Sequence, residues 1–203
     1  MDCNRELLDH LKRRGALKTP AIVAAFEAVD RIHFIRPQAQ REAYGDHPLS
    51  IGHGQTISQP YTVAFMLEKL QPATGQQVLD VGAGSGWTTA LLSHIVGPSG
   101  SVSGTEIVAD LVRFGRENLA KFDFPQGRIA PAGETVGRPG TTFDRILVSA
   151  AARTIPAPLV DQLKRGGRLV IPVQSSIYLV VRDEGGRVSE EEFFGFSFVP
   201  LIT

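Results

Sequence analysis

The chain has 203 residues, of which 42% are hydrophobic and 21% charged, a composition typical of one ordinary globular domain. Its 21 Lys and Arg residues equal its 21 Asp and Glu residues in number, so the formal net charge is zero. This balance disfavours a nucleic-acid binder or a protein held to acidic membranes, because both normally carry a basic excess.

The compartment is predicted from the cysteine content and the hydropathy. Cys3 is the only cysteine, so no internal disulfide can form, which fits a reducing environment. The charged N-terminus lacks the apolar core of a signal peptide, and no apolar run is long enough to span a bilayer. We therefore expect a cytoplasmic, monomeric protein that binds neither nucleic acid nor membrane.

The first predicted elements are two helices. Leu7, Leu8 and Leu11 form one apolar stripe on a helix over residues 3–14. Thr19 and Pro20 are typical of an N-cap and first helical residue, and the helix they begin reaches about residue 29. Residues 30–57 have no clear period, and a segment that long in a compact domain is usually functional or needs another assignment.

From residue 60 onward, predicted helices and strands alternate. The helices cover residues 60–70, 86–96, 108–121 and 159–164, and the strands cover residues 77–81, 101–105, 128–132, 143–148 and 168–172. Two last strands, 177–182 and 192–199, are joined by Asp183-Glu184-Gly185-Gly186 as a hairpin. This pattern predicts one α/β domain over residues 1–203, with a doubly wound, seven-stranded, mostly parallel sheet and an N-terminal helical appendage.

A glycine cluster directly follows the first strand of this sheet. Gly82, Gly84 and Gly86 permit a tight turn and a close approach of the backbone to a ligand. Asp80 stands two residues before the first of them, and Glu106 follows the last by 20 residues, at the end of the second strand. An acid at that place can accept hydrogen bonds from both hydroxyls of a ribose.

The glycine spacing separates two classes of ligand. A dinucleotide site has Gly-x-Gly-x-x-Gly, whereas here the third glycine comes one place early and Trp87 stands where that pattern needs glycine. The negative charge of Asp80 disfavours a pyrophosphate and suits the amine and sulfonium of S-adenosylmethionine. The pattern favours this methyl donor over a dinucleotide or a purely structural turn. The alternatives are Asp80 as a helix N-terminal acid and Glu106 as a surface residue.

The segment GHGQTISQPY, residues 52–61, allows two interpretations of Ser58. Ser58 or Thr56 is a reasonable N-cap for a helix that has Pro60 in its first turn, and for an isolated segment capping is the leading explanation. The long irregular approach to this segment, however, favours a loop that covers the cofactor and shapes a pocket.

Residues 46–60, DHPLSIGHGQTISQP, resemble the signature of protein-L-isoaspartate O-methyltransferases. The resemblance covers roughly residues 5–201, and its other matches are Arg31–Phe34, Ala43-Tyr44, the glycine loop, the strand ending at Glu106, Ile155–Leu163, Gly166–Val173 and Phe198–Leu201. The family implies a Rossmann-like fold, with residues 1–58 as N-terminal helices and active-site loop and 59–203 as cofactor-binding core and C-terminal hairpin.

The resemblance also implies the reaction and its residues. Such enzymes move a methyl group from S-adenosylmethionine to the α-carboxylate of L-isoaspartyl residues in damaged proteins, and the ester then collapses to a succinimide. Ser58 corresponds to the active-site residue. The cofactor-binding residues implied by the resemblance and the glycine pattern are Gln55, Thr56, Ile57, Asp80, Gly82, Gly84, Ser85, Glu106, Ile107, Gly133 and Glu134.

Two positions depart from the family pattern. Gly133-Glu134-Thr135 stands where the family usually has Gly-Asp-Gly at the adenine end of the cofactor, and Gln174 stands where a glycine is usual. The first departure affects the expected adenine contact, and the second affects the loop that closes over the peptide. Neither touches the Ser58 segment or the glycine loop.

This chemistry needs little catalytic apparatus. A carboxylate acceptor, with a pKa of about 3.5 to 4, is ionised at pH 7 and needs no general base, so Ser58 is expected to orient it by one hydrogen bond. No histidine pair has a metal-ligand spacing, so no metal site is expected. Two other functions remain open: methylation of a different carboxylate, and a cofactor-binding module without activity.

Overall fold

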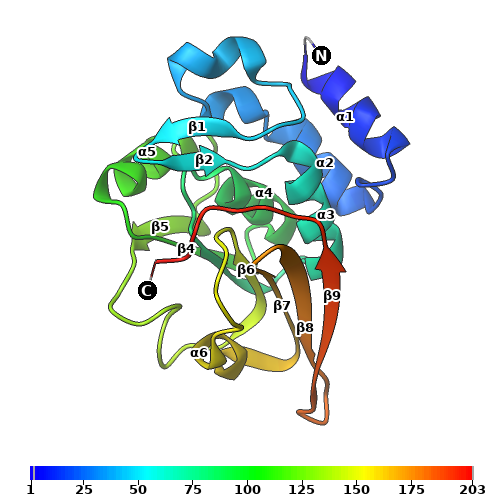
Figure 1. Ribbon diagram of the computed structural model, residues 1–203, viewed down its shortest axis with the longest axis vertical. Helices are drawn as coiled ribbons and strands as arrows, with labels where there is room; N and C mark the ends of the chain where they lie inside the picture. Colours follow the sequence, from blue (N-terminus) through cyan, green and yellow to red (C-terminus); the bar gives the residue numbers. More distant parts are fainter. Residues whose placement is uncertain (2, 203) are drawn as a thin grey trace.

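The computed structural model describes Met1 and residues 3–202, and its centre is a seven-stranded sheet (Figure 1). The strand order is β5-β4-β3-β6-β7-β8-β9, parallel from β5 to β7 and antiparallel for the last two strands. The strands are β3 (Gln77–Val81), β4 (Ser101–Glu106), β5 (Gly127–Pro131), β6 (Phe143–Val148), β7 (Leu163–Val173), β8 (Ser176–Arg182) and β9 (Val188–Phe194). The predicted mostly parallel, doubly wound sheet with a closing hairpin is confirmed.

Alternating residues of the buried strands pack into two separate hydrophobic cores, one on each face of the sheet. Val78 packs in the larger core, while its neighbour Leu79 packs in the smaller one on the opposite face. The larger core contains residues of α3 (Pro60–Leu70), α4 (Trp87–Val96) and α5 (Ala109–Leu119), and the smaller one contains residues of the short α6 (Ala157–Asp161). Helices therefore cover both faces, which is why the central strands are apolar almost throughout.

The N-terminal helices share the larger core. Apolar side chains of α1 (Asn4–Arg13) and α2 (Pro20–Ala28) belong to the same cluster as those of α3 and α4. Thr19 is the N-cap residue of α2, as predicted, but its hydroxyl donates to Glu68 Oε2 at 2.6 Å and makes no capping bond. Glu68 also accepts from the backbone N–H groups of Lys18 and Thr19, at 2.7 Å each. The appendage is thus attached to α3 by both packing and polar contacts.

Residues 30–57 are more regular than their sequence suggests. They contain the 3₁₀ helices η1 (Arg31–Phe34) and η2 (Pro37–Glu42), followed by an antiparallel pair of strands, β1 (Leu49–Gly52) and β2 (Gln55–Ile57). Three successive residues with positive φ, Gly52 at 94°, His53 at 56° and Gly54 at 70°, make the turn between the strands. Figure 1 shows this hairpin, in cyan, lying over α4 and α5.

Two predicted boundaries are wrong near the C-terminus. The helix expected over residues 159–164 ends at Asp161 in the structure, and Leu163 already begins β7. The strand expected over residues 192–199 ends at Phe194, because Gly195 has φ of 105° and its N–H donates to Ser175 O at 3.0 Å. Figure 1 shows the following segment, in red, crossing from β9 back toward β4.

Candidate active site

One pocket lies at the carboxyl ends of β3, β4 and β6, where a doubly wound sheet normally binds its ligand. About 800 Å³ of space free of protein atoms lies within it, part of it open to solvent. Its wall comprises Ile51, Gln55, Thr56, Ile57, Ser58, Val63, Val81, Gly82, Ala83, Gly84, Ser85, Trp87, Thr88, Thr105, Glu106, Ile107, Ala132, Ser149, Ala150, Val199, Pro200, Leu201 and Ile202.

The glycine loop forms the floor of this pocket. The N–H groups of Gly82 and Ala83 donate to Thr105 O at 2.9 and 3.0 Å, which ties the loop to the end of β4. Gly86 has φ of 87°, and a Cβ atom there would lie 2.8 Å from the carbonyl oxygen of Gly115 in α5. Only glycine allows this close contact between loop and helix, as the sequence pattern indicates.

Glu106 is the acid of the pocket. Its side chain is buried, with 6% of the residue exposed, and it accepts from Gly84 N–H through Oε2 and from Val108 N–H through Oε1, both at 2.9 Å. Each carboxylate oxygen can accept more than one hydrogen bond, so both can still bind ligand hydroxyls. Next to it, Ile107 is 51% exposed, an apolar surface on the wall that suits a flat ring.

Asp80 lies behind the wall of the pocket, contrary to the expected direct contact with the cofactor. It shares the sheet face of Val78, so its side chain turns toward α4, where Thr88 and Thr89 donate to Oδ2 at 2.8 and 2.7 Å. Burial raises the pKa of Asp80 to about 6, and the two threonine hydroxyls oppose that shift. Its other oxygen, Oδ1, has no partner among the described residues.

This raised pKa makes stability depend on pH. Between about pH 4 and pH 6 the unfolded carboxyl is ionised while the folded one keeps its proton, so wild-type stability falls as pH rises. Asp80→Asn removes this loss, since asparagine stays neutral. The unfolding free energy of the variant minus that of wild type should therefore increase by on the order of 3 kcal/mol between pH 4 and pH 7, because burial raises the pKa of Asp80 by about two units.

Urea unfolding of both proteins across this pH range checks the prediction. A constant difference between the variant and wild type would show that Asp80 does not titrate in that range.

Ser58 is half-buried in the pocket wall and does not cap α3. The N-cap residue is Gln59, and the N–H of Tyr61 is instead satisfied by Oδ1 of Asp46 at 2.9 Å. The capping interpretation of Ser58 is therefore wrong, and so is that of Thr56, which lies in β2. The Ser58 hydroxyl has no hydrogen-bond partner in the part of the chain that the structure describes. It is free to bind a ligand.

The structure brings most of the expected site residues together. Nine of them lie in the wall: Gln55, Thr56, Ile57, Ser58, Gly82, Gly84, Ser85, Glu106 and Ile107. Gly133 and Glu134 lie outside it and are exposed, and the neighbouring Ala132 takes that place, with its N–H donating to Glu106 O at 2.8 Å. The adenine contact expected of Glu134 is therefore not supported by its position.

Two parts of the pocket wall were not predicted from the sequence. Ser149 and Ala150 follow β6, and residues 199–202 return from β9 along the same edge. The segment is attached to Ala151, whose N–H donates to Val199 O and whose O accepts from Leu201 N–H, both at 2.8 Å. The family match at Phe198–Leu201 was a signal for the second part, but those residues were assigned to a strand and not to the pocket.

Neither a metal centre nor a membrane span is found in the described residues. No group of three or more His, Cys, Asp or Glu residues there could hold a metal ion. Within the same residues, no helix combines the length and the apolar character needed to cross a bilayer.

Comparison with known proteins identifies the family. The sequence model of the family described as Protein-L-isoaspartate(D-aspartate) O-methyltransferase (PCMT) matches residues 2–203. The chain belongs to this family. Among curated isoaspartate methyltransferases it is 41% identical to that of Thermococcus onnurineus, over 96% of this chain and 91% of the relative. It is 40% identical to that of Methanopyrus kandleri, over 97% and 89% respectively.

Solved structures of the same enzyme class share the fold. A Plasmodium falciparum protein assigned to the isoaspartate methyltransferases, crystallised with S-adenosyl-L-homocysteine, is 29% identical and has a TM-score of 0.88. The match covers 100% of this chain and 99% of that one. A second protein-L-isoaspartate O-methyltransferase, 23% identical, has a TM-score of 0.86 over 98% of this chain and 66% of its own, which shows the fold alone.

Proposed function

We propose that the chain transfers a methyl group from S-adenosylmethionine to the α-carboxylate of L-isoaspartyl residues in damaged proteins, with Ser58 at the acceptor. It is a methyltransferase of the isoaspartate family, and its cofactor is S-adenosylmethionine. The observation that carries the proposal is the single pocket whose wall contains both the Gln55–Ser58 segment and the glycine loop with Glu106. Donor and acceptor can thus meet in one cavity.

The residues present fit the cofactor. Glu106 supplies a buried carboxylate for the two ribose hydroxyls, and Ile107 and Ala132 supply apolar wall for the adenine. Gly82 and Gly84 leave the floor without side chains, so backbone groups can approach the methionine part of the ligand. Asp80 acts from behind the floor, where its charge favours a cationic ligand without touching it. When bound, S-adenosylmethionine supplies an electrophilic methyl group on a sulfonium.

The protein's part in the reaction is to position and to exclude water. The acceptor carboxylate is ionised at pH 7, with a pKa of about 3.5 to 4, and needs no base to remove a proton. Ser58 donates a hydrogen bond that holds one carboxylate oxygen, and β2 and residues 199–202 flank the cavity. Opposite charges on acceptor and sulfonium decrease during the transfer, so exclusion of water from the cavity assists it. The ester product then closes to a succinimide, which starts repair.

The partners follow from this reaction. They are proteins and peptides that carry an isoaspartyl residue, and the balanced charge disfavours nucleic acid. We propose further that the chain acts as a monomer in the cytoplasm. The single cysteine fits a reducing compartment.

Methyl transfer to a matched pair of peptides tests the function. The peptides are identical except for L-isoaspartate or L-aspartate at one position, and the donor is labelled S-adenosylmethionine. We expect a base-labile methyl ester on the isoaspartyl peptide alone. Equal labelling of both peptides would show a different carboxylate specificity. Donor binding without labelling of either would show a binding module or another substrate.

A further inference from the structure

A buried arginine lies directly behind the part of the pocket wall that contains Ser58, which we call the acceptor side. Arg31, in η1, is 0% exposed, and its guanidinium lies over the ring of Trp87 in the pocket wall, 5.5 Å from the ring centroid. Its two Nη atoms donate to four backbone carbonyl oxygens at 2.8, 3.1, 3.0 and 3.0 Å, those of Ala43, Gly45, His47 and Ser58. The first three belong to one segment, so Arg31 joins residues 43–47 to Ser58.

Stabilising a loop with a buried guanidinium has a large desolvation penalty. Burial lowers the pKa of Arg31 to about 10, opposed by the charge of Asp46, so the guanidinium remains protonated at pH 7. Its nearest acceptors are neutral carbonyls, and Nε has no partner among the residues that the structure describes. Apolar side chains could fill the same volume without burying a charge. The rigid planar fork of arginine is what lets four carbonyls converge at fixed positions.

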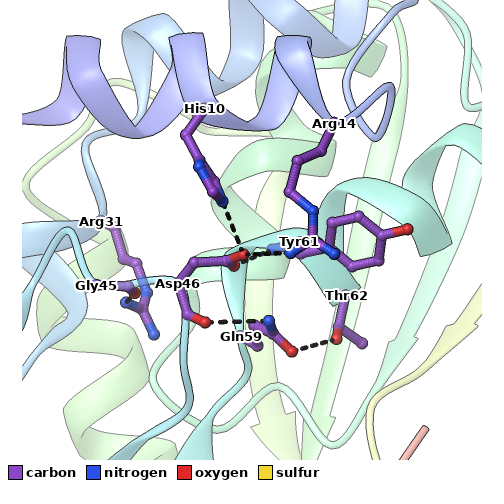
Figure 2. Close-up of polar contacts among 8 residues, drawn as sticks. All are labelled: His10, Arg14, Arg31, Gly45, Asp46, Gln59, Tyr61 and Thr62. Atoms are coloured by element: carbon purple, nitrogen blue, oxygen red, sulfur yellow. Dashed lines mark hydrogen bonds and ion pairs between the residues drawn. The ribbon is translucent and has the colours of Figure 1, made fainter. Parts of the chain in front are cut away.

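Asp46 binds the residues that follow Ser58 in the chain. Figure 2 shows its backbone oxygen accepting from Gln59 Nε2 at 3.0 Å, and Oδ1 accepts from Tyr61 N–H at 2.9 Å. Its Oδ2 lies 3.3 Å from His10 Nε2 and 3.5 Å from Arg14 Nη1, which connects α1 to the same point. Gln59 and Tyr61 are thus bound directly to Asp46, and Ser58 is joined to the same segment through Arg31.

We propose that Arg31, assisted by Asp46, is a positioning residue that fixes the backbone of Ser58 so that its hydroxyl meets the acceptor carboxylate. The inference rests on the proposed function and deepens it. The contacts hold the carbonyl oxygen of Ser58 and leave its hydroxyl without a partner in the described chain. The hydroxyl and the carbonyl that Arg31 holds belong to the same residue, Ser58. A shift of the Ser58 backbone therefore also moves the hydroxyl that binds the substrate.

The cofactor side of the pocket is held by other contacts. Neither Arg31 nor Asp46 lies in the pocket wall, whereas Glu106 is bound to Gly84 and Val108, and the glycine loop to Thr105. Loss of the Arg31 contacts should therefore lower kcat for the peptide by a larger factor than it lowers the affinity for S-adenosyl-L-homocysteine.

The experiment is a double-mutant cycle with Arg31→Lys and Ser58→Ala. Lysine keeps the charge but cannot bind four carbonyls in a plane, so Ser58 should shift. Since a misplacement of about 1 Å can cost on the order of 100-fold in rate, we expect kcat of Arg31→Lys to fall ~10-fold or more. In the Ser58→Ala background the same change should have almost no effect, because the hydroxyl that it misplaces is absent.

Arg145→Lys is the matched control. Arg145, in β6, is half-buried and, like Arg31, donates to three or more backbone oxygens, those of Gln71, Asp144 and Gly166, but it is outside the pocket wall. It should leave kcat unchanged in both backgrounds.

Additive losses from Arg31→Lys and Ser58→Ala, or a parallel loss of cofactor affinity, would overturn the proposal and leave Arg31 a purely structural residue. If Arg31→Lys does not fold, Asp46→Ala replaces it in the cycle, since alanine removes both the oxygen that accepts from Tyr61 N–H and the charge that faces Arg14. The same non-additivity is then expected. Wild-type protein is assayed first, so a failure of the proposed function appears before any variant is made.

Discussion

Replacing Glu106 by alanine should weaken the binding of S-adenosyl-L-homocysteine by at least ~100-fold, because two hydrogen bonds to a charged acceptor are each worth ~1.5–3 kcal/mol. Those two bonds are the ones that we propose Glu106 accepts from the ribose hydroxyls. The variant also leaves the N–H groups of Gly84 and Val108 without their carboxylate, which loosens the loop that approaches the ligand. Glu106→Gln keeps one acceptor oxygen, and its loss should be intermediate.

Calorimetric titration of the ligand into each variant measures the effect. Glu117→Ala is the control, since Glu117 is an exposed acid on α5 and does not line the pocket. Its affinity should equal that of wild type. Urea unfolding separates lost contacts from lost structure. Unchanged affinity in a folded Glu106→Ala protein would show that the ribose lies elsewhere in the pocket.

The sheet and its cofactor side could be predicted from the sequence, because both depend on short-range patterns. Val78, Leu79 and Val81 give β3 the apolar character of a buried parallel strand, and the glycines mark the turn after it. Glu106 could be placed because the length of the connecting helix fixes where the next parallel strand ends. Each of these features needs only residues close together in the chain.

The acceptor side depends on contacts between distant residues, which single-sequence patterns do not show. The strands β1 and β2 have four and three residues, too few for a clear period, and they are stabilised by packing on the larger core. The N-terminus of α3 is capped by Asp46, 15 residues before the bonded N–H of Tyr61, so the sequence alone leaves capping by the nearby Ser58 as an open alternative. Asp80 is expected at the cofactor because it stands two residues before the first glycine, although the alternation of β3 turns its side chain toward α4.

Replacing Ser58 by alanine should lower kcat for an isoaspartyl peptide ~10-fold or more, equivalent to ~1.4 kcal/mol in the barrier, while the protein stays folded. Stability should hardly change, because Gln59 is the N-cap residue of α3 and no described residue bonds to the Ser58 hydroxyl. Without that hydroxyl, one oxygen of the acceptor loses its fixed position. The residual activity should remain, since the acceptor is already ionised and Ser58 removes no proton.

The measurement is the initial rate of methyl transfer at saturating S-adenosylmethionine, with urea unfolding of the same preparations. Ser189→Ala is the control: Ser189 is an exposed serine in β9, outside the pocket wall. It should match wild type in rate and in stability. Two results would contradict an orienting role for Ser58. A wild-type rate from Ser58→Ala would place the acceptor away from this hydroxyl, and complete loss of activity would indicate that Ser58 attacks or transfers a proton.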